Sequence, residues 1–583
     1  MVFDGDDLKT RDGSTEQITL AGIKRIFEYK RIGEASRYLI LAADGKLYDS
    51  TDLVTPILTI AAMTDFSFVN FFNRAYISPH DRVSGLSGEN VQVYDGTGVA
   101  RVAAGAAPSG SIITADGASG DIEAGTHLIA VAYESDSGYI TVPGPTLFDA
   151  YVAPGAKKCD LSTVPTGPAG IAKRHILATK SIASYDGNQT GYVFYFVPGA
   201  TITDNVTTTI TIDFFDANLI SDATYLFDQL TTLPAGLGLC ELDGRLVLWG
   251  ADGLESIVYI SKAGEPESIN SVDGFMVVDP TEAGIVTNCF GFRGSLVVCK
   301  KRRLYQATPT SSNAGYWPWI SIDRGKGTTV FGLANIIDSR GTNLDYAIIA
   351  DQSGVYLFDG VVREPDLTWK IRDFWRDRLN QTVLEVIQVA VDPVAKCIYI
   401  AVPLDSATEP TYILTGDFQN GLNHEKIRWL LWEFPVKCTS ILVQEDATLE
   451  HPVLSYGSSE GNIYSIDSAV TSDDSVAIPD PMIKTSLLHR WKDGTIHHFD
   501  RGAFRVQGSG NLDISVGGLD DQNTTNLALI ALAANPGFAE HRHINYEGER
   551  MYIKMSTNAI GETFTFSRLS VGAAFKWASR PIA

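Results

Sequence analysis

The sequence predicts an all-β protein, and three observations carry this prediction. A short phrase, a β-branched residue or Leu followed by Tyr and often by Asp, returns along the chain. Aromatic and β-branched residues are frequent, and 53 Gly and 24 Pro supply turns between short strands. Long stretches with helical periodicity are nearly absent. With 583 residues, the chain has room for about three or four packed domains.

The recurring phrase has seven copies, and its tyrosines set a period. Five of the six gaps between successive tyrosines are 46 to 56 residues long, which is the length of one four-stranded β-propeller blade. The remaining gap is 165 residues, or 119 more than the 46-residue period. We therefore predict a seven-bladed β-propeller with a domain inserted between blades two and three, although such pairs also recur by chance in β-rich chains. The tyrosines are Tyr48, Tyr94, Tyr259, Tyr305, Tyr356, Tyr412 and Tyr464.

The start of the chain divides into an arm and two blades. Residues 1–18 are polar and predict an arm. An alternating pattern at 23–29 and the apolar strand that follows it at 38–43 predict the first strands of blade one, and further strand patterns between 66 and 94 predict blade two. The arm and the two blades together occupy residues 1–105.

The surplus between the second and third tyrosines predicts an inserted domain over residues 106–225. Small residues dominate 105–120 and indicate a loose linker at its entry. Five short strand patterns in little more than 100 residues are typical of a small immunoglobulin- or fibronectin-like β-sandwich. These patterns lie at 126–133, 138–141, 175–179, 192–197 and 207–212.

Blades three to seven are expected over residues 226–470, followed by a C-terminal domain over 471–583. The seventh blade lacks its own fourth strand, and residues 17–20 would complete it and close the ring, which removes the exposed edges of an open sheet. Strand patterns after residue 480 predict a second β-sandwich. An apolar run at 527–534 is compatible with a helix or with a loop packed on that sandwich.

The chain is strongly acidic, with a formal charge of −23 and a pI of about 4.8. Such a surface repels nucleic acid over most of its area, and it equally favours solubility. One dense basic run interrupts it. The run is either a solvated turn between two strands of blade four or a local contact with DNA phosphates or an acidic partner. It consists of Lys300, Lys301, Arg302 and Arg303.

The sequence offers no pattern typical of a catalytic, metal or cofactor site. The six cysteines lack metal-ligand spacing and indicate buried thiols in a reducing compartment. His541 and His543 lie two apart and would share one face of a strand, but no Cys or carboxylate cluster accompanies them. We therefore predict no metal, no cofactor and no enzymatic activity. The sequence also indicates neither a signal peptide nor a membrane span.

Several strings in chain order resemble one known family, the tail nozzle (tail tubular B-type) proteins of short-tailed bacteriophages. In the predicted propeller they are Gly45–Ser50 and Phe66–Arg74. In the predicted insert they are Ala124–His127 and Lys173–Thr179. The central strings are Leu242–Leu246 and Ser261–Ile269. The resemblance covers nearly the whole chain, but its motifs are turns and strands and it transfers no catalytic residue.

The resemblance implies a virion component of the phage tail, assembled in the cytoplasm of a bacterial host. Proteins of this family form a ring, typically a homohexamer, below the adaptor ring and the portal. Genomic DNA passes through the lumen of the ring during ejection, and tail fibres dock on its flanks. An acidic lumen would bind phosphates weakly, which suits passage.

Two other classes of protein remain open from the residues alone. One is a receptor- or carbohydrate-binding propeller of the tail-spike kind, which a measurable affinity for glycans would favour. The other is a propeller scaffold for cellular protein partners, which a monomer that binds host proteins would favour. An ordered ring of the purified protein would favour the nozzle.

Overall fold

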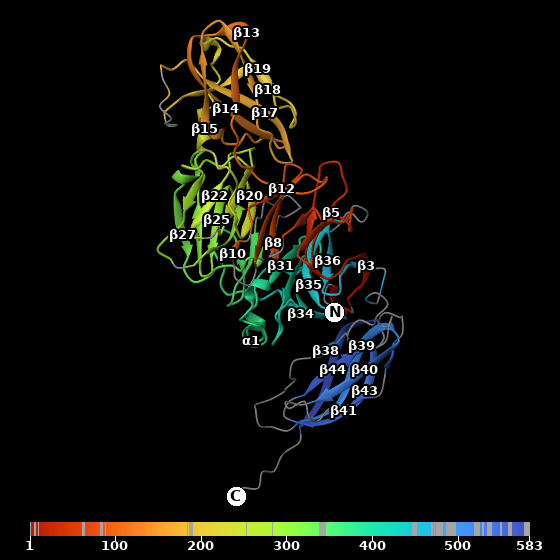
Figure 1. The fold of residues 1–583 in the computed structure, drawn as a ribbon. Coiled ribbons are helices and arrows are strands. Elements are labelled where there is room, and N and C mark those ends of the chain that lie inside the picture. Colours follow the sequence, from red (N-terminus) through yellow and green to blue (C-terminus); the bar gives the residue numbers. More distant parts are fainter. Residues whose placement is uncertain are drawn as a thin grey trace.

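The computed structural model is all-β, as the sequence predicts, with one short α-helix, α1 (Arg372–Asp377), among the described residues. Figure 1 shows three parts: an upper part of strands β13 to β19, a middle part with most of the sheets, and a lower part that contains β38 to β44. The structure describes residues 2–4, 7–9, 11–60, 64–81, 86–87, 89–183, 185, 191–251, 253–282, 284–336, 346–445, 452–467, 470, 473, 482–484, 497–517, 525–527, 530–532, 539–548, 551–557 and 563–575.

The middle part consists, in the described residues, of seven antiparallel sheets that follow one another along the chain, here called the ring sheets. Sheets one to three are β4 (Ile23–Tyr29), β5 (Arg37–Ala42), β6 (Lys46–Asp49) and β7 (Leu58–Thr59); β8 (Asp65–Phe71), β9 (Arg74–Asp81), β10 (Leu86–Ser87), β11 (Gln92–Tyr94) and β12 (Arg101–Val102); and β20 (Gly238–Leu242), β21 (Arg245–Trp249), β22 (Ile257–Ile260) and β23 (Phe275–Val277).

Four more ring sheets complete the middle part. They are β24 (Val286–Phe292), β25 (Ser295–Lys300), β26 (Arg303–Ala307) and β27 (Trp319–Asp323); β28 (Leu333–Ile336), β29 (Tyr346–Ala350) and β30 (Val355–Phe358); β31 (Gln388–Asp392), β32 (Cys397–Val402), β33 (Tyr412–Asp417) and β34 (Arg428–Glu433); and β35 (Cys438–Glu445), β36 (Pro452–Ser458) and β37 (Asn462–Asp467), joined by β3 (Gly13–Thr19). Short 3-10 turns η1 (Asp216–Asn218), η2 (Thr224–Asp228), η3 (Ala314–Tyr316), η4 (Trp369–Ile371) and η5 (Leu384–Val386) lie in connections.

Apolar clusters between neighbouring ring sheets form the core of the middle part. Among the described residues each sheet shares one buried cluster with the sheet before it and another with the sheet after it. The last sheet returns to the first through Ile463, which packs with Ile23, Ile26 and Ile40. Because the seventh sheet packs on the first, the succession of sheets is closed and burial stabilises every member of it.

The closing strand is contributed by the N-terminus. Strand β3 pairs antiparallel with β37, and Thr19 lies opposite Asn462. This confirms the expectation that residues 17–20 complete the last sheet. The first and the last ring sheets are therefore joined by the backbone hydrogen bonds between β3 and β37, and not by side-chain packing alone.

The seven tyrosines of the recurring phrase occupy equivalent places. Each lies on the strand that follows the first hairpin of its ring sheet, counting β6, β11, β22, β26, β30, β33 and β37. Five of them are buried, whereas Tyr259 and Tyr412 are partly exposed. The phrase thus marks a strand with a buried face. The turn after this strand often begins with Asp, because the Asp side chain accepts backbone N–H groups there. Asp49, for example, accepts from Thr51 N at 2.9 Å.

The upper part consists of two sheets that pack face to face around a shared apolar core. Leu161, Ile176 and Ile212 belong to this core, so the two sheets enclose one apolar layer. One sheet contains β13 (Ile113–Ile122), β16 (Lys157–Ser162) and β19 (Ile210–Ile212), and the other contains β15 (Gly144–Ala153), β14 (Gly125–Ser135), β17 (Ile171–Thr179) and β18 (Phe194–Ile202).

Two local expectations for this upper part are wrong. Residues 105–120 were expected to be a loose linker, but β13 begins at Ile113. The small residues of this edge strand let it lie close to its neighbour β16. A Cβ on Gly120, for example, would lie 2.5 Å from Lys158 Cγ. Residues 138–141 were expected to be a strand, but Gly138 has a φ of +86° and its N–H bonds back to Ser135 O at 3.0 Å, so the chain turns there.

The lower part combines the C-terminal residues with the N-terminus. Its sheets pack around a core that includes Phe504, Ile514 and Ile553. The first residues, expected to be a polar arm, instead form a hairpin whose second strand pairs with β45. One sheet is β1 (Val2–Asp4), β2 (Asp7–Lys9), β45 (Thr563–Phe575), β39 (His497–Ser509) and β43 (Ala539–Gly548); the other is β38 (Met482–Lys484), β44 (Tyr552–Ser556), β40 (Asn511–Gly517), β41 (Thr525–Asn526) and β42 (Ile530–Ala531).

Both chain connections to the upper part leave from one place on the ring sheets. Leu233 N donates to Ala103 O at 3.4 Å, and both residues belong to one buried cluster. We predict that replacing residues 106–225 by a short Gly/Ser bridge leaves the ring sheets folded, because the two ends already lie side by side. Circular dichroism and limited proteolysis of this variant check the prediction. A protein that is insoluble or lacks β-structure would contradict it.

No described helix is long and apolar enough to cross a membrane.

Candidate functional site

The first strands of the seven ring sheets surround an axial cavity of about 390 Å³. Apolar side chains such as Phe68, Phe290 and Val389 line most of it. Its polar side chains are engaged in contacts between neighbouring sheets. Ser67 Oγ donates to Leu237 O at 2.6 Å, and Asn288 Nδ2 donates to Val330 O at 3.0 Å. These contacts hold adjacent first strands together.

An arginine of the first ring sheet reaches across the axial cavity to the fifth. Arg25 is 2% exposed, and its Nε donates to Asp65 Oδ1 at 2.9 Å across the first two sheets. Its guanidinium carbon lies 3.8 Å from the centre of the Phe331 ring, which precedes β28 in the fifth sheet. A cavity of this volume accommodates a small molecule and not a polymer.

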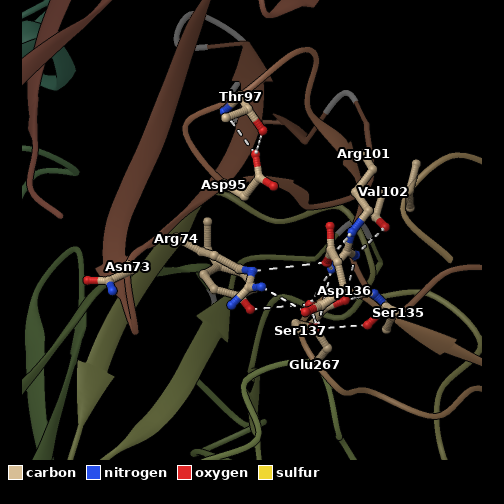
Figure 2. A network of polar contacts seen from close by, with 12 residues as sticks. Asn73, Arg74, Asp95, Thr97, Arg101, Val102, Ser135, Asp136, Ser137 and Glu267 are labelled. Atoms are coloured by element: carbon tan, nitrogen blue, oxygen red, sulfur yellow. Dashed lines mark hydrogen bonds and ion pairs between the residues drawn. The ribbon is translucent and has the colours of Figure 1, made fainter. Parts of the chain in front are cut away.

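A second polar cluster fixes the upper part to the ring sheets, and Figure 2 shows it closely. Its centre is Glu267, which is 1% exposed and follows β22. Arg101 of β12 donates to both carboxylate oxygens of Glu267, at 2.8 and 3.0 Å. Ser137 Oγ, in the turn after β14, donates to Glu267 Oε1 at 2.6 Å. We call Arg101, Asp136, Ser137 and Glu267 the junction network.

The junction network and the groups that contact it come from four separate segments of the chain. Arg101 Nε donates to Asp136 Oδ1 at 3.0 Å, and Arg74 of the β8–β9 hairpin donates to the backbone oxygen of Asp136 at 2.8 Å (Figure 2). Ala104 N donates to Glu267 Oε2 at 2.7 Å, at the point where the chain leaves for the upper part. The turn at 135–138, unexpected from the sequence, is thus the element that carries Asp136 and Ser137 to the junction.

The electrostatics of the junction network favour its charged state. Burial alone would raise the pKa of the Glu267 carboxyl, but the hydrogen bonds and charge of Arg101, with the Ser137 hydroxyl and the Ala104 N–H, hold that pKa below its ordinary value. Burial would lower the pKa of Arg101, but Glu267 and Asp136 raise it above its usual range. The pair therefore stays ionised at neutral pH, and its geometry is the bidentate one that Arg and a carboxylate prefer.

The basic run spans the end of β25, the turn and the start of β26, so only part of it is the solvated turn that one interpretation expected. Lys300 is 1% exposed, and its Nζ donates to Ser256 Oγ and to Asp279 O, both at 2.9 Å. Arg303 forms an ion pair with Glu282 at 2.8 Å. Lys301 and Arg302 are exposed. Binding of DNA or of an acidic partner by this run stays a prediction. Lys301 and Arg302 are the members of the run that such a partner could reach.

The described residues contain no group of three or more His, Cys, Asp or Glu side chains that could hold a metal ion. His541 and His543 lie on β43 as the strand prediction for them requires, and their side chains fall outside the described ones. The six cysteines are not disulfide-bonded in the structure, and burial raises the pKa of Cys299 to about 12.

The junction network could not be predicted from the sequence. Glu267 belongs to the string Ser261–Ile269 and Arg101 follows the second tyrosine phrase, but nothing in either string signals burial. The two residues are 166 positions apart, and the intervening insert separates them in sequence while its turn joins them in space. The one signal in the sequence was the inserted domain itself, because the two ends of the insert had to meet on the same surface of the ring sheets.

Comparisons with known proteins place the chain near no family. No protein-family model and no curated protein matches it. One similar solved structure is an exo-beta-1,3-galactanase from Phanerochaete chrysosporium, with 9% identity over 58% of this chain and 96% of that chain and a TM-score of 0.24. Another is PorZ, a surface component of the type-IX secretion system of Porphyromonas gingivalis, with 10% identity over 99% of this chain and 86% of that chain and a TM-score of 0.22.

The first of these likenesses corrects one expectation. The sequence predicts a protein without enzymatic activity. That prediction is wrong as a deduction, because one of the similar solved structures, the galactanase, is a glycoside hydrolase. At these TM-scores neither likeness assigns an activity, a substrate or a catalytic residue to this chain.

Proposed function

We propose that this chain is a structural virion protein that forms the tail nozzle ring of a short-tailed bacteriophage, a conduit and gate for genome ejection below the portal and the adaptor ring. In this proposal the seven ring sheets are the blades of a β-propeller, the upper part is an immunoglobulin-like β-sandwich, and the lower part is a C-terminal β-sandwich. Tail fibres and the adaptor ring would be its neighbours in the virion, and copies of itself its partners in the ring.

The observation that carries the proposal is the order of the parts along the chain. Two ring sheets precede the upper part, five follow it, and the lower part takes up both chain ends. This order coincides with the resemblance of the strings Gly45–Ser50, Lys173–Thr179 and Ser261–Ile269 to nozzle proteins. Arg25 and Phe331 meet across the axial cavity of each chain, so in this proposal the conduit forms between copies. The charge of −23 would keep DNA from adhering to its wall.

The oligomeric state of the purified full-length chain tests the proposal. Sedimentation velocity and negative-stain electron microscopy are expected to show a closed ring of several copies, typically six, and a panel of bacterial surface glycans is expected to show no saturable binding. A monomer at every concentration would contradict the nozzle. A monomer that binds one glycan specifically would instead favour the receptor-binding class.

A further inference from the structure

The lower part carries two arginines side by side on one exposed sheet surface. Arg505 of β39 lies directly opposite Arg568 of β45, and both side chains are exposed. Phe504, next to Arg505, is fully buried in the core between the two sheets. Because successive residues of a strand point to opposite faces, Arg505 and Arg568 stand on the outer face of this sheet.

The register adds further basic positions to the same rows. Ala539 of β43 lies on the other side of Arg505. In the next row His541 and Ser570 lie opposite Ala503, and in the row after that His543 and Gly572 lie opposite Arg501. Residues taken at intervals of two share one face of a strand, so these rows gather Arg and His positions separated by Ala, Ser and Gly. We call the surface around Arg505 and Arg568 the basic sheet face.

A pair of like charges directly across two strands destabilises a sheet, by up to about 1 kcal/mol. Among the residues that the structure describes, no carboxylate forms an ion pair with Arg505 or Arg568. The Arg505 side chain is itself exposed to approach. An arginine pair in this setting is suited to bind an anionic group from outside, since each guanidinium can take a carboxylate bidentately.

We propose that the basic sheet face docks on an acidic surface of a second copy of this chain. The chain carries −23 charges, so every copy presents acidic surface complementary to this face. The same charge repels DNA at a distance, which disfavours a nucleic acid as the occupant. A contact between two different surfaces of one chain repeats head to tail and closes a ring where its rotation permits. The proposal rests on the ring of the proposed function and names the surface that builds it.

Charge reversal on the full-length chain tests the docking surface. The variant R505E/R568E is expected to lower the association constant about 100-fold or more, because it places repulsion in the contact. The variant K426E/K437E changes the net charge equally at two exposed lysines of the ring sheets and is expected to assemble within about 3-fold of the wild type. Sedimentation velocity at several concentrations and salt levels measures both, and rising salt should weaken the wild-type contact.

The neutral variant R505Q/R568Q separates docking from folding. It removes the cross-strand repulsion, so the thermal stability of the monomer is expected to stay equal or to rise, while assembly falls at least about 10-fold. Wild-type rings with R505E/R568E rings of equal stability would overturn the docking surface and leave the nozzle intact. A monomeric wild type would overturn the nozzle as well. Tight binding of duplex DNA that R505Q/R568Q abolishes, with assembly unchanged, would assign the face to DNA and overturn self-docking.

Discussion

Replacing Glu267 by Gln is expected to cost about 3 kcal/mol of local stability at the junction network, because a buried ion pair loses one partner. Arg101, with 11% of its side chain exposed, would keep only Asp136 as an ion-pair partner, and the Gln amide nitrogen cannot accept from Ala104 N. Hydrogen exchange of the backbone at 101–104 and 135–139 should accelerate about 100-fold, as 3 kcal/mol requires. The upper part would then loosen on the ring sheets.

A neighbouring substitution provides the control. Glu265 is exposed two residues earlier, so Glu265→Gln is expected to change stability by less than about 0.5 kcal/mol. The effect of Glu267→Gln should also depend on pH. The pKa of Glu267 is lowered in the folded chain, so its contribution is complete above the ordinary pKa of about 4.3 and is lost as the pH falls through the folded value. Unchanged exchange in Glu267→Gln at pH 7 would mean that the network does not hold the junction.

Removing residues 1–19 is expected to open the ring sheets and to leave no stably folded chain. The deletion takes away β3, and with it the backbone ladder on β37. It also takes away Arg11, whose guanidinium binds the Asp473 carboxylate where both are at most 3% exposed. An unpaired carboxylate at this depth costs about 3–5 kcal/mol, and the lost ladder adds to that cost. Thermal unfolding and limited proteolysis measure the outcome.

A shorter deletion separates the two roles of the N-terminus. Removing residues 1–9 keeps Arg11 and β3 but takes away the hairpin that pairs with β45. The ring sheets are expected to stay resistant to proteolysis, whereas the lower part becomes the first site of cleavage. Equal stability of the two deletions would show that β3 does not close the ring sheets.

The sequence predicted the parts of the fold that depend on local patterns. The tyrosine phrase marked equivalent strands because Tyr48 and Tyr356 each fill a buried position beside a turn that needs Asp or Gly. The closing role of residues 17–20 followed from a missing strand in the last sheet. Strand β13 was missed because an edge strand needs few apolar residues, and its pattern of Gly, Ala and Asp resembles a linker.

The contacts between distant segments could not be predicted. Arg101 and Glu267 meet because an insert leaves and re-enters the ring sheets at one place, and no local pattern encodes that meeting. Lys300 looked like part of a surface charge run, but its amino group is buried among the Ser256 hydroxyl and backbone oxygens. Arg505 and Arg568 are 63 residues apart and only the strand register brings them together. In each case the partner is set by tertiary structure.

A cryo-electron-microscopy reconstruction of the purified full-length chain tests the central claim most directly. The account predicts a closed ring with a central channel formed between copies and wide enough for a DNA duplex, while Arg25 and Phe331 stay in contact across the axial cavity of each chain. The basic sheet face of each copy should lie against its neighbour. Single chains without ring contacts at every concentration, or a ring whose centre is filled by protein, would contradict the conduit.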